Sequence, residues 1–116
     1  MRLKSDIFAS ALVRRVFSGG GFAAIERKGA AEAGAIFIRQ RFRDGLETLY
    51  GPAPQSYFAE DEEADPGARR FEVREERAEA ERVAETIARE MKWDSDLWLI
   101  ELEVDEIGDL IELAKA

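Results

Sequence analysis

The chain has 116 residues, of which 46% are hydrophobic and 36% are charged, and its formal net charge is -8 at pH 7. This length and composition are typical of one globular domain with a heavily charged surface. The absence of cysteine and histidine excludes disulfides, cysteine-ligated metal sites and every catalytic triad that needs histidine.

A first helix is predicted over about residues 6–18, where Leu12 and Val16 belong to an apolar stripe with helical spacing. Ser5 is a suitable N-cap. Gly19–Gly21 end the helix, because glycine readily adopts the left-handed conformation found at helix C-termini. These glycines follow a helix and do not precede one, so they do not form a phosphate-binding loop.

Three strands are predicted next, over residues 22–28, 35–42 and 46–50. The second strand alternates apolar residues with arginines, as a strand with one buried face does. Asp44-Gly45 is a strong turn signal that joins it to the third strand in a hairpin. The sequence Gly51–Pro54 ends the third strand, because its prolines cannot donate hydrogen bonds to a neighbouring strand.

The second half of the chain begins with an acidic segment, residues 59–69, which we predict to be a mobile loop because its charges repel one another. A short strand over 70–74 follows, then a long amphipathic helix over about 76–93. A strand over 97–104 and a short tail helix within 105–116 complete the chain.

This α-β-β-β-β-α-β order predicts a single α+β domain over residues 1–116. We expect an antiparallel or mixed sheet of about five strands that packs against the two main helices, with both helices on one face. No segment is long and apolar enough to span a membrane, and residues 1–6 lack the layout of a signal peptide. A cytoplasmic location is therefore predicted.

Charge is distributed unevenly along the chain. Residues 1–58 contain 9 Lys or Arg against 5 Asp or Glu, whereas residues 59–116 contain 8 against 20. Because the two halves belong to one compact domain, we expect them to form ion pairs with each other, with surplus acid on the surface.

Arg39, Arg41 and Arg43 recur at period two and project from one face of the second strand. They could follow a phosphate backbone, with aromatic residues nearby for stacking. Alternatively, they pair with acids on neighbouring strands, and the acidic net charge favours this interpretation. The candidate partners are Glu47, Glu72, Glu101 and Glu103.

A group of carboxylates in the last third of the chain could serve as a metal or acid–base site. Its members are Asp94, Asp96, Glu101, Glu103 and Asp105. They lack the spacing of a calcium-binding loop, so a solvated face is expected, and we predict no metal and no cofactor.

Aromatic and proline residues around residues 50–58 form the candidate interaction surface. They could recognise a partner, or their rings could fold back and seal the edge of the core. The candidate residues are Tyr50, Pro52, Pro54, Tyr57 and Phe58, with Arg39 and Arg41 on the adjoining strand.

Five segments together make the chain resemble the family of small bacterial proteins known as domain of unknown function 1491. They are Ala11–Arg15, Gly20–Ala23, Glu32–Phe37, Leu49–Gln55 and Asp94–Trp98. The resemblance covers nearly the whole chain, and it implies no catalytic residues because the family has no assigned activity.

The leading hypothesis is a non-enzymatic protein-binding or self-associating module that uses the 50–58 loop and the adjoining sheet edge, with a protein partner or a second copy. The alternative is a small ligand-binding domain or enzyme that uses an arginine and carboxylate site on an anionic substrate. A third hypothesis is nucleic-acid binding through Arg39, Arg41 and Arg43. Whether the chain is an enzyme stays open.

Overall fold

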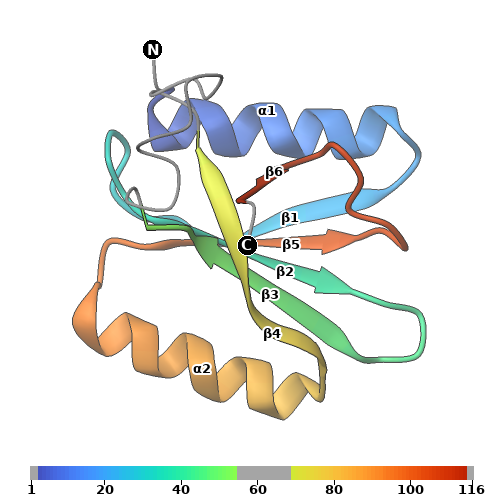
Figure 1. The fold of residues 1–116 in the computed structure, drawn as a ribbon. Coiled ribbons are helices and arrows are strands. Elements are labelled where there is room, and N and C mark those ends of the chain that lie inside the picture. Colours follow the sequence, from blue (N-terminus) through green and yellow to red (C-terminus); the bar gives the residue numbers. More distant parts are fainter. Residues whose placement is uncertain (1–2, 55–68, 115–116) are drawn as a thin grey trace.

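A computed structural model of the chain describes residues 3–54 and 69–114 (Figure 1). Apart from residue 69, the predicted mobile loop over 59–69 lies outside these ranges. The elements are α1 (Ser5–Ser18), β1 (Phe22–Arg27), β2 (Ile36–Arg41), β3 (Glu47–Pro52), β4 (Arg70–Ala78), α2 (Ala80–Trp93), β5 (Trp98–Glu103) and β6 (Glu112–Leu113).

The strands form one mixed sheet in the order β1-β5-β2-β3-β4-β6. Strands β2 and β5 are parallel, as are β4 and β6, and the other three neighbouring pairs are antiparallel. The predicted α+β class, element order and mixed sheet are confirmed, with six strands in place of about five.

The prediction that both helices cover one face of the sheet is wrong, because α1 and α2 lie on opposite faces (Figure 1). In β2, Ile36 and Ile38 belong to the core cluster under α1, whereas Phe37 belongs to the cluster under α2. The central strands therefore carry apolar residues at both alternating positions, and each face needs its own cover.

The predicted tail helix within 105–116 is also wrong. Ile107, Leu110 and Ile111 do pack against the core under α1, but the chain between them turns at Gly108, whose φ is +50°. That conformation is incompatible with a continuing right-handed helix. The segment then forms β6, which pairs with Arg70 and Phe71 of β4.

Ser5 is not the N-cap of α1 but its first helical residue. Its side chain is buried, and its hydroxyl donates a hydrogen bond to the backbone oxygen of Gly34 at 2.6 Å. Strand β4 is longer than predicted and ends at Ala78, so α2 begins at Ala80. The backbone N–H of Arg77 donates to the hydroxyl of Thr48 on β3, which holds this extension against the sheet.

Candidate functional site

Two arginines of β2 lie among three carboxylates on the α2 face of the sheet. We call this group the ionic network; its members are Glu26, Arg39, Arg41, Glu47 and Glu101. Strand register brings them together, because Arg41 is paired with Glu47 of β3 and Arg39 is paired with Glu101 of β5. Arg39, Glu47 and Glu101 each lie two positions from a residue of the apolar cluster under α2 on their own strand, and Arg41 follows Arg39 at the same spacing, so these side chains point to one face.

The network is closely connected. Arg41 places Nε 2.9 Å from Glu47 Oε2 and Nη1 2.8 Å from Glu101 Oε1. Arg39 Nε lies 3.6 Å from the other Glu47 oxygen, and Arg39 Nη2 donates to Glu26 of β1. The predicted cross-strand pairing with Glu47 and Glu101 is confirmed, and Glu26 is a partner that sequence reasoning missed.

Burial shapes the electrostatics of the network. The Glu47 side chain is only 1% exposed, and its two oxygens face two guanidinium groups. Burial raises the pKa of Glu26, an effect that the nearby Arg39 opposes. The pKa of Arg41 is raised mainly by its hydrogen bond to Glu47. The carboxylates of the network outnumber its arginines by three to two; Arg39 is largely buried among them, whereas the Arg41 side chain is 44% exposed.

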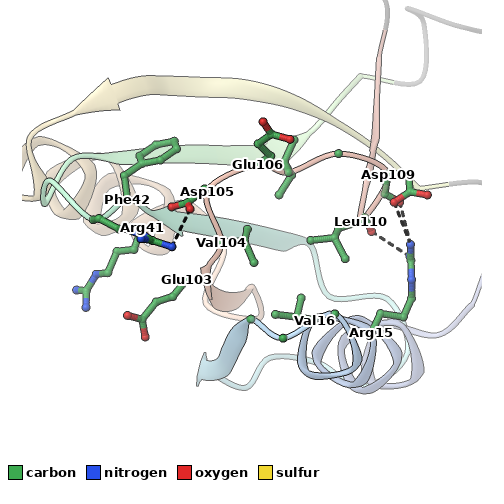
Figure 2. A pocket seen from close by; sticks show the side chains of 16 residues that line it. Arg15, Val16, Arg41, Phe42, Glu103, Val104, Asp105, Glu106, Asp109 and Leu110 are labelled. Carbon is green, nitrogen blue, oxygen red and sulfur yellow. Dashed lines mark hydrogen bonds and ion pairs between the residues drawn. The ribbon is translucent and has the colours of Figure 1, made fainter.

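A hollow of about 610 Å³ lies at the carboxyl ends of the parallel strands β2 and β5. Figure 2 shows Arg41, Glu103 and Asp105 on one side of it and Arg15 of α1 on the other. Arg15 donates hydrogen bonds to the backbone oxygens of Asp109 and Leu110, so it anchors the wall of the hollow. Arg43 lines the hollow as well, and its Nη2 lies 3.1 Å from Asp105 Oδ2.

The carboxylates considered as a metal site are not brought together. Asp94 and Asp96 lie in the turn before β5, where Asp94 accepts a hydrogen bond from the backbone N–H of Asp96. Glu101 belongs to the ionic network, while Glu103 and Asp105 line the hollow. Within residues 3–54 and 69–114, no group of three acidic side chains could hold a metal ion.

The predicted interaction surface around residues 50–58 is divided. Tyr50 is buried in the core, and its hydroxyl donates to Gln40 Oε1 at 2.8 Å. Burial also raises its pKa. For Tyr50 the second alternative holds, in which the ring packs onto the core, because position 50 of β3 points to the cluster under α1 while Leu49 points to the cluster under α2. Pro52 is half-buried, Pro54 is exposed, and Tyr57 and Phe58 lie outside the described residues.

An exposed apolar strip follows α1 and the neighbouring terminal strand β1. We call it the α1–β1 strip; its residues are Ile7, Ser10, Ala11, Arg14, Phe17, Phe22 and Ile25. The four large apolar side chains are 41–51% exposed. The rings of Phe17 and Phe22 meet edge to face, with centroids 5.7 Å apart. Sequence reasoning missed the strip, although Ile7 and Phe17 are apolar residues on the far side of α1 from Leu12 and Val16.

The two elements of the strip enclose a shallow hollow of about 810 Å³. Ile7, Ser10 and Arg14 line it from α1, and Ile25 and Lys28 line it from the other side. Ile7, Arg14 and Ile25 thus share this hollow, and the Phe17 and Phe22 rings meet each other at the C-terminal end of α1. No helix in the described part of the chain is long and apolar enough to cross a membrane.

Comparison with known proteins gives one family and several structures. A model described as "Protein of unknown function (DUF1491)" matches residues 3–112. A protein from A. tumefaciens with a known solution structure is 59% identical, with a TM-score of 0.86 over 100% of this chain and 98% of that one.

The crystal structure of a DUF1491 family protein from Caulobacter crescentus is 25% identical, with a TM-score of 0.77 over 99% of this chain and 100% of that one. An NMR structure of a DUF1491 family protein from the same organism is 26% identical, with a TM-score of 0.76 over 99% of each chain. No curated protein matches the chain.

Proposed function

This chain belongs to the DUF1491 family of proteins of unknown function, and we propose that it is a non-enzymatic protein-binding module that contacts its partner through the α1–β1 strip. The observation that carries this proposal is the clustering of exposed apolar side chains. Ile7, Phe17, Phe22 and Ile25 make up half of the large apolar side chains that are exposed in the described ranges. Clustered exposed apolar residues are typical of contact surfaces, whereas scattered ones are ordinary.

The position of β1 adds a second line of support. It is the terminal strand of the sheet on one side, so its outer backbone groups have no strand partner among the described residues. Extended segments of other proteins commonly bind to such an edge. The irregular pairing between Ile25 and Arg27 limits regular strand addition to the first residues of β1, next to Phe22.

The proposed contact surface is not the 50–58 loop that the sequence suggests. Tyr50 contributes to the core, whereas Phe22 and Ile25 reach solvent on a strand that has a free edge. The kind of function stays the same, and the surface moves to the opposite end of the sheet.

A crosslinking experiment tests this proposal. Phe22 is replaced by the photoreactive residue p-benzoylphenylalanine in cells that produce the chain, and adducts formed on illumination are identified by mass spectrometry. We expect one discrete protein adduct that disappears when Ile25→Lys is added. The same photoreactive residue at position 93 is the control, because Trp93 is 90% exposed and lies on α2, across the sheet (Figure 1).

Val73→Lys is the matched control for Ile25→Lys, because Val73 is also an exposed apolar residue of a strand (45% against 41%). It should leave the adduct unchanged. Identical adducts from positions 22 and 93, or no adduct from position 22, would overturn the proposal.

The second candidate function is small-ligand binding at the hollow in Figure 2, which Arg41 and Glu103 line and where Arg43 pairs with Asp105. Such mixed charges suit a small molecule that carries an anionic group. Titration with inorganic phosphate or a small dicarboxylate should shift the backbone amide NMR signals of residues 103–106, and Arg41→Gln should weaken the shifts. Unchanged spectra at low salt would exclude this candidate.

A further inference from the structure

The charges on the α1–β1 strip can be matched by a second copy of the same strip. Asp6 lies at the start of α1, and Arg14 lies about two turns further along the same side of the helix, since both line the same hollow. Neither residue forms an ion pair with any residue in ranges 3–54 and 69–114, and Lys28 is equally unpaired there. When two copies of α1 run antiparallel, the unpaired negative charge at one end of each helix lies opposite the unpaired positive charge of the other.

The middle of α1 is suited to close contact with a second helix. Ser10 and Ala11 lie between the charged ends and have small side chains. Two helices approach most closely where the side chains at their contact are small. In this register Ile7 of one copy lies about one helical turn from Phe17 of the other, so both apolar side chains lie along the contact.

The whole chain carries a charge of -8, so two copies repel each other over most of their surfaces. Around the strip this acidic surplus is absent, because Asp6 lies at the same hollow as Arg14 and Lys28, while the Glu26 carboxylate pairs with Arg39 on the other face of the sheet. Attraction between copies is therefore favoured at this surface, which also carries exposed apolar area.

Building on the proposed function, we infer that the partner is a second copy of this chain. The two α1 helices pack antiparallel about a two-fold axis near Ser10 and Ala11, and Asp6 of each copy pairs with Arg14 of the other. A two-fold contact uses the same patch on both copies, so every pair forms twice. The two β1 strands flank the helix pair with Phe22 and Ile25.

Charge exchange tests this arrangement. The dimer dissociation constant is measured by sedimentation equilibrium for the wild type, Asp6→Arg, Arg14→Asp and the double variant. We expect a concentration-dependent dimer for the wild type, and each single variant should weaken it about tenfold because two like-charge pairs replace two attractive ones. The double variant restores opposite charges at both pairs, so its dissociation constant should return to within about threefold of the wild-type value.

A second measurement does not depend on charge reversal. Because the chain has no cysteine, Ser10→Cys provides a single site for a nitroxide label. The nitroxide-carrying copy, which has no isotope label, is mixed with an isotopically labelled wild-type copy. If the two associate, the nitroxide should broaden the NMR signals of residues 6–17 in the wild-type copy. The signals of α2, on the other face of the sheet, serve as the internal control.

A wild-type chain that stays monomeric, a double variant that is not restored, or unbroadened signals of residues 6–17 would overturn self-association. If the chain is monomeric but the adduct from position 22 contains a different protein, only this inference fails and the proposed function stands. If the chain is monomeric and position 22 forms no adduct, both fail.

Discussion

The two faces of the sheet are stabilised in different ways. Under α1, buried apolar residues extend from Ala23 on β1 to Phe71 on β4, and Ile111 at the C-terminal end of the chain completes the cluster. Under α2, the apolar cluster centres on Phe37 and Leu49, and the ionic network begins two residues further along the strands. One face has a continuous apolar core, and the other combines a smaller core with charge pairs.

This difference arises because different segments of the chain pack on the two faces of the sheet. The α1 face is covered by α1 and by the segment that carries Ile107 and Leu110. On the other face, α2 packs mainly against β3 and β4, so much of the face is left for other groups. Arginine and glutamate side chains fill it, because their long aliphatic parts cover the sheet while their charged ends pair with one another. The two faces should therefore respond differently to substitution.

The largest loss is expected on the α1 face. Trp98 is buried, and its Nε1–H donates to the backbone oxygen of Ala30 at 2.8 Å. Trp98→Ala removes the ring, leaves a cavity and should lower the free energy of unfolding by about 4 kcal/mol, measured by urea denaturation. Trp93→Ala is the control, with an expected change within about 0.5 kcal/mol. Similar losses from the two variants would contradict a continuous core on the α1 face.

The next largest loss is expected in the ionic network. Glu47→Gln keeps the shape of the side chain but removes the charge that compensates Arg39 and Arg41, so we expect a loss of about 3 kcal/mol in the free energy of unfolding. Glu103→Gln is the matched control, because Glu103 is an exposed glutamate at the end of β5, and it should change stability by less than about 0.5 kcal/mol. If the two substitutions cost the same, the network contributes no stability to the α2 face.

Local sequence patterns predicted the elements well because the signals are local. The first helix and the strands around Asp44-Gly45 begin and end within two residues of the predicted positions, since spacing, glycines and turn residues determine them. The tail helix failed because the left-handed Gly108 and pairing with Arg70 and Phe71 outweigh an apolar spacing that suits a helix.

The ionic network could be predicted in part, since Glu47 and Glu101 are among the acids that the sequence offers as partners of the β2 arginines. Pairing of Arg41 with Glu47 follows from the hairpin, and both residues were named from the sequence. Glu26 and the α1–β1 strip could not be found in the same way, because they depend on a strand order in which β5 inserts between β1 and β2. The position of Tyr50 could not be decided from the sequence, because both faces of β3 are buried, and its ring packs into the cluster under α1.

A smaller effect is expected from the buried polar pair on the α1 face. Tyr50→Phe removes the hydroxyl that donates to Gln40 Oε1 and leaves a buried acceptor unsatisfied, which should cost about 2 kcal/mol at pH 7. Because the pKa of Tyr50 is raised in the folded protein, the wild type loses stability as pH rises above the ordinary tyrosine value. The difference between the two proteins should therefore narrow above about pH 10. A difference that stays constant with pH would contradict a desolvated hydroxyl.

The smallest effect, and the only stabilising one, is expected at the edge of the ionic network. Burial raises the pKa of Glu26, so its charged form is disfavoured in the folded protein, and the network already has more carboxylates than arginines. Glu26→Gln should raise the free energy of unfolding at pH 7 by up to about 1 kcal/mol, a small value because the carboxylate keeps contact with solvent.

The sign of the pH dependence identifies the cause. A carboxyl whose folded pKa is raised gives its full stability below the unfolded pKa and loses it as pH rises through the folded pKa. The advantage of Glu26→Gln should therefore shrink as pH falls from 7 and vanish below about pH 4. If Glu26→Gln stays more stable than the wild type in urea titrations at low pH, the gain in the free energy of unfolding comes from changed packing at β1. The charge of Glu26 would then not be its cause.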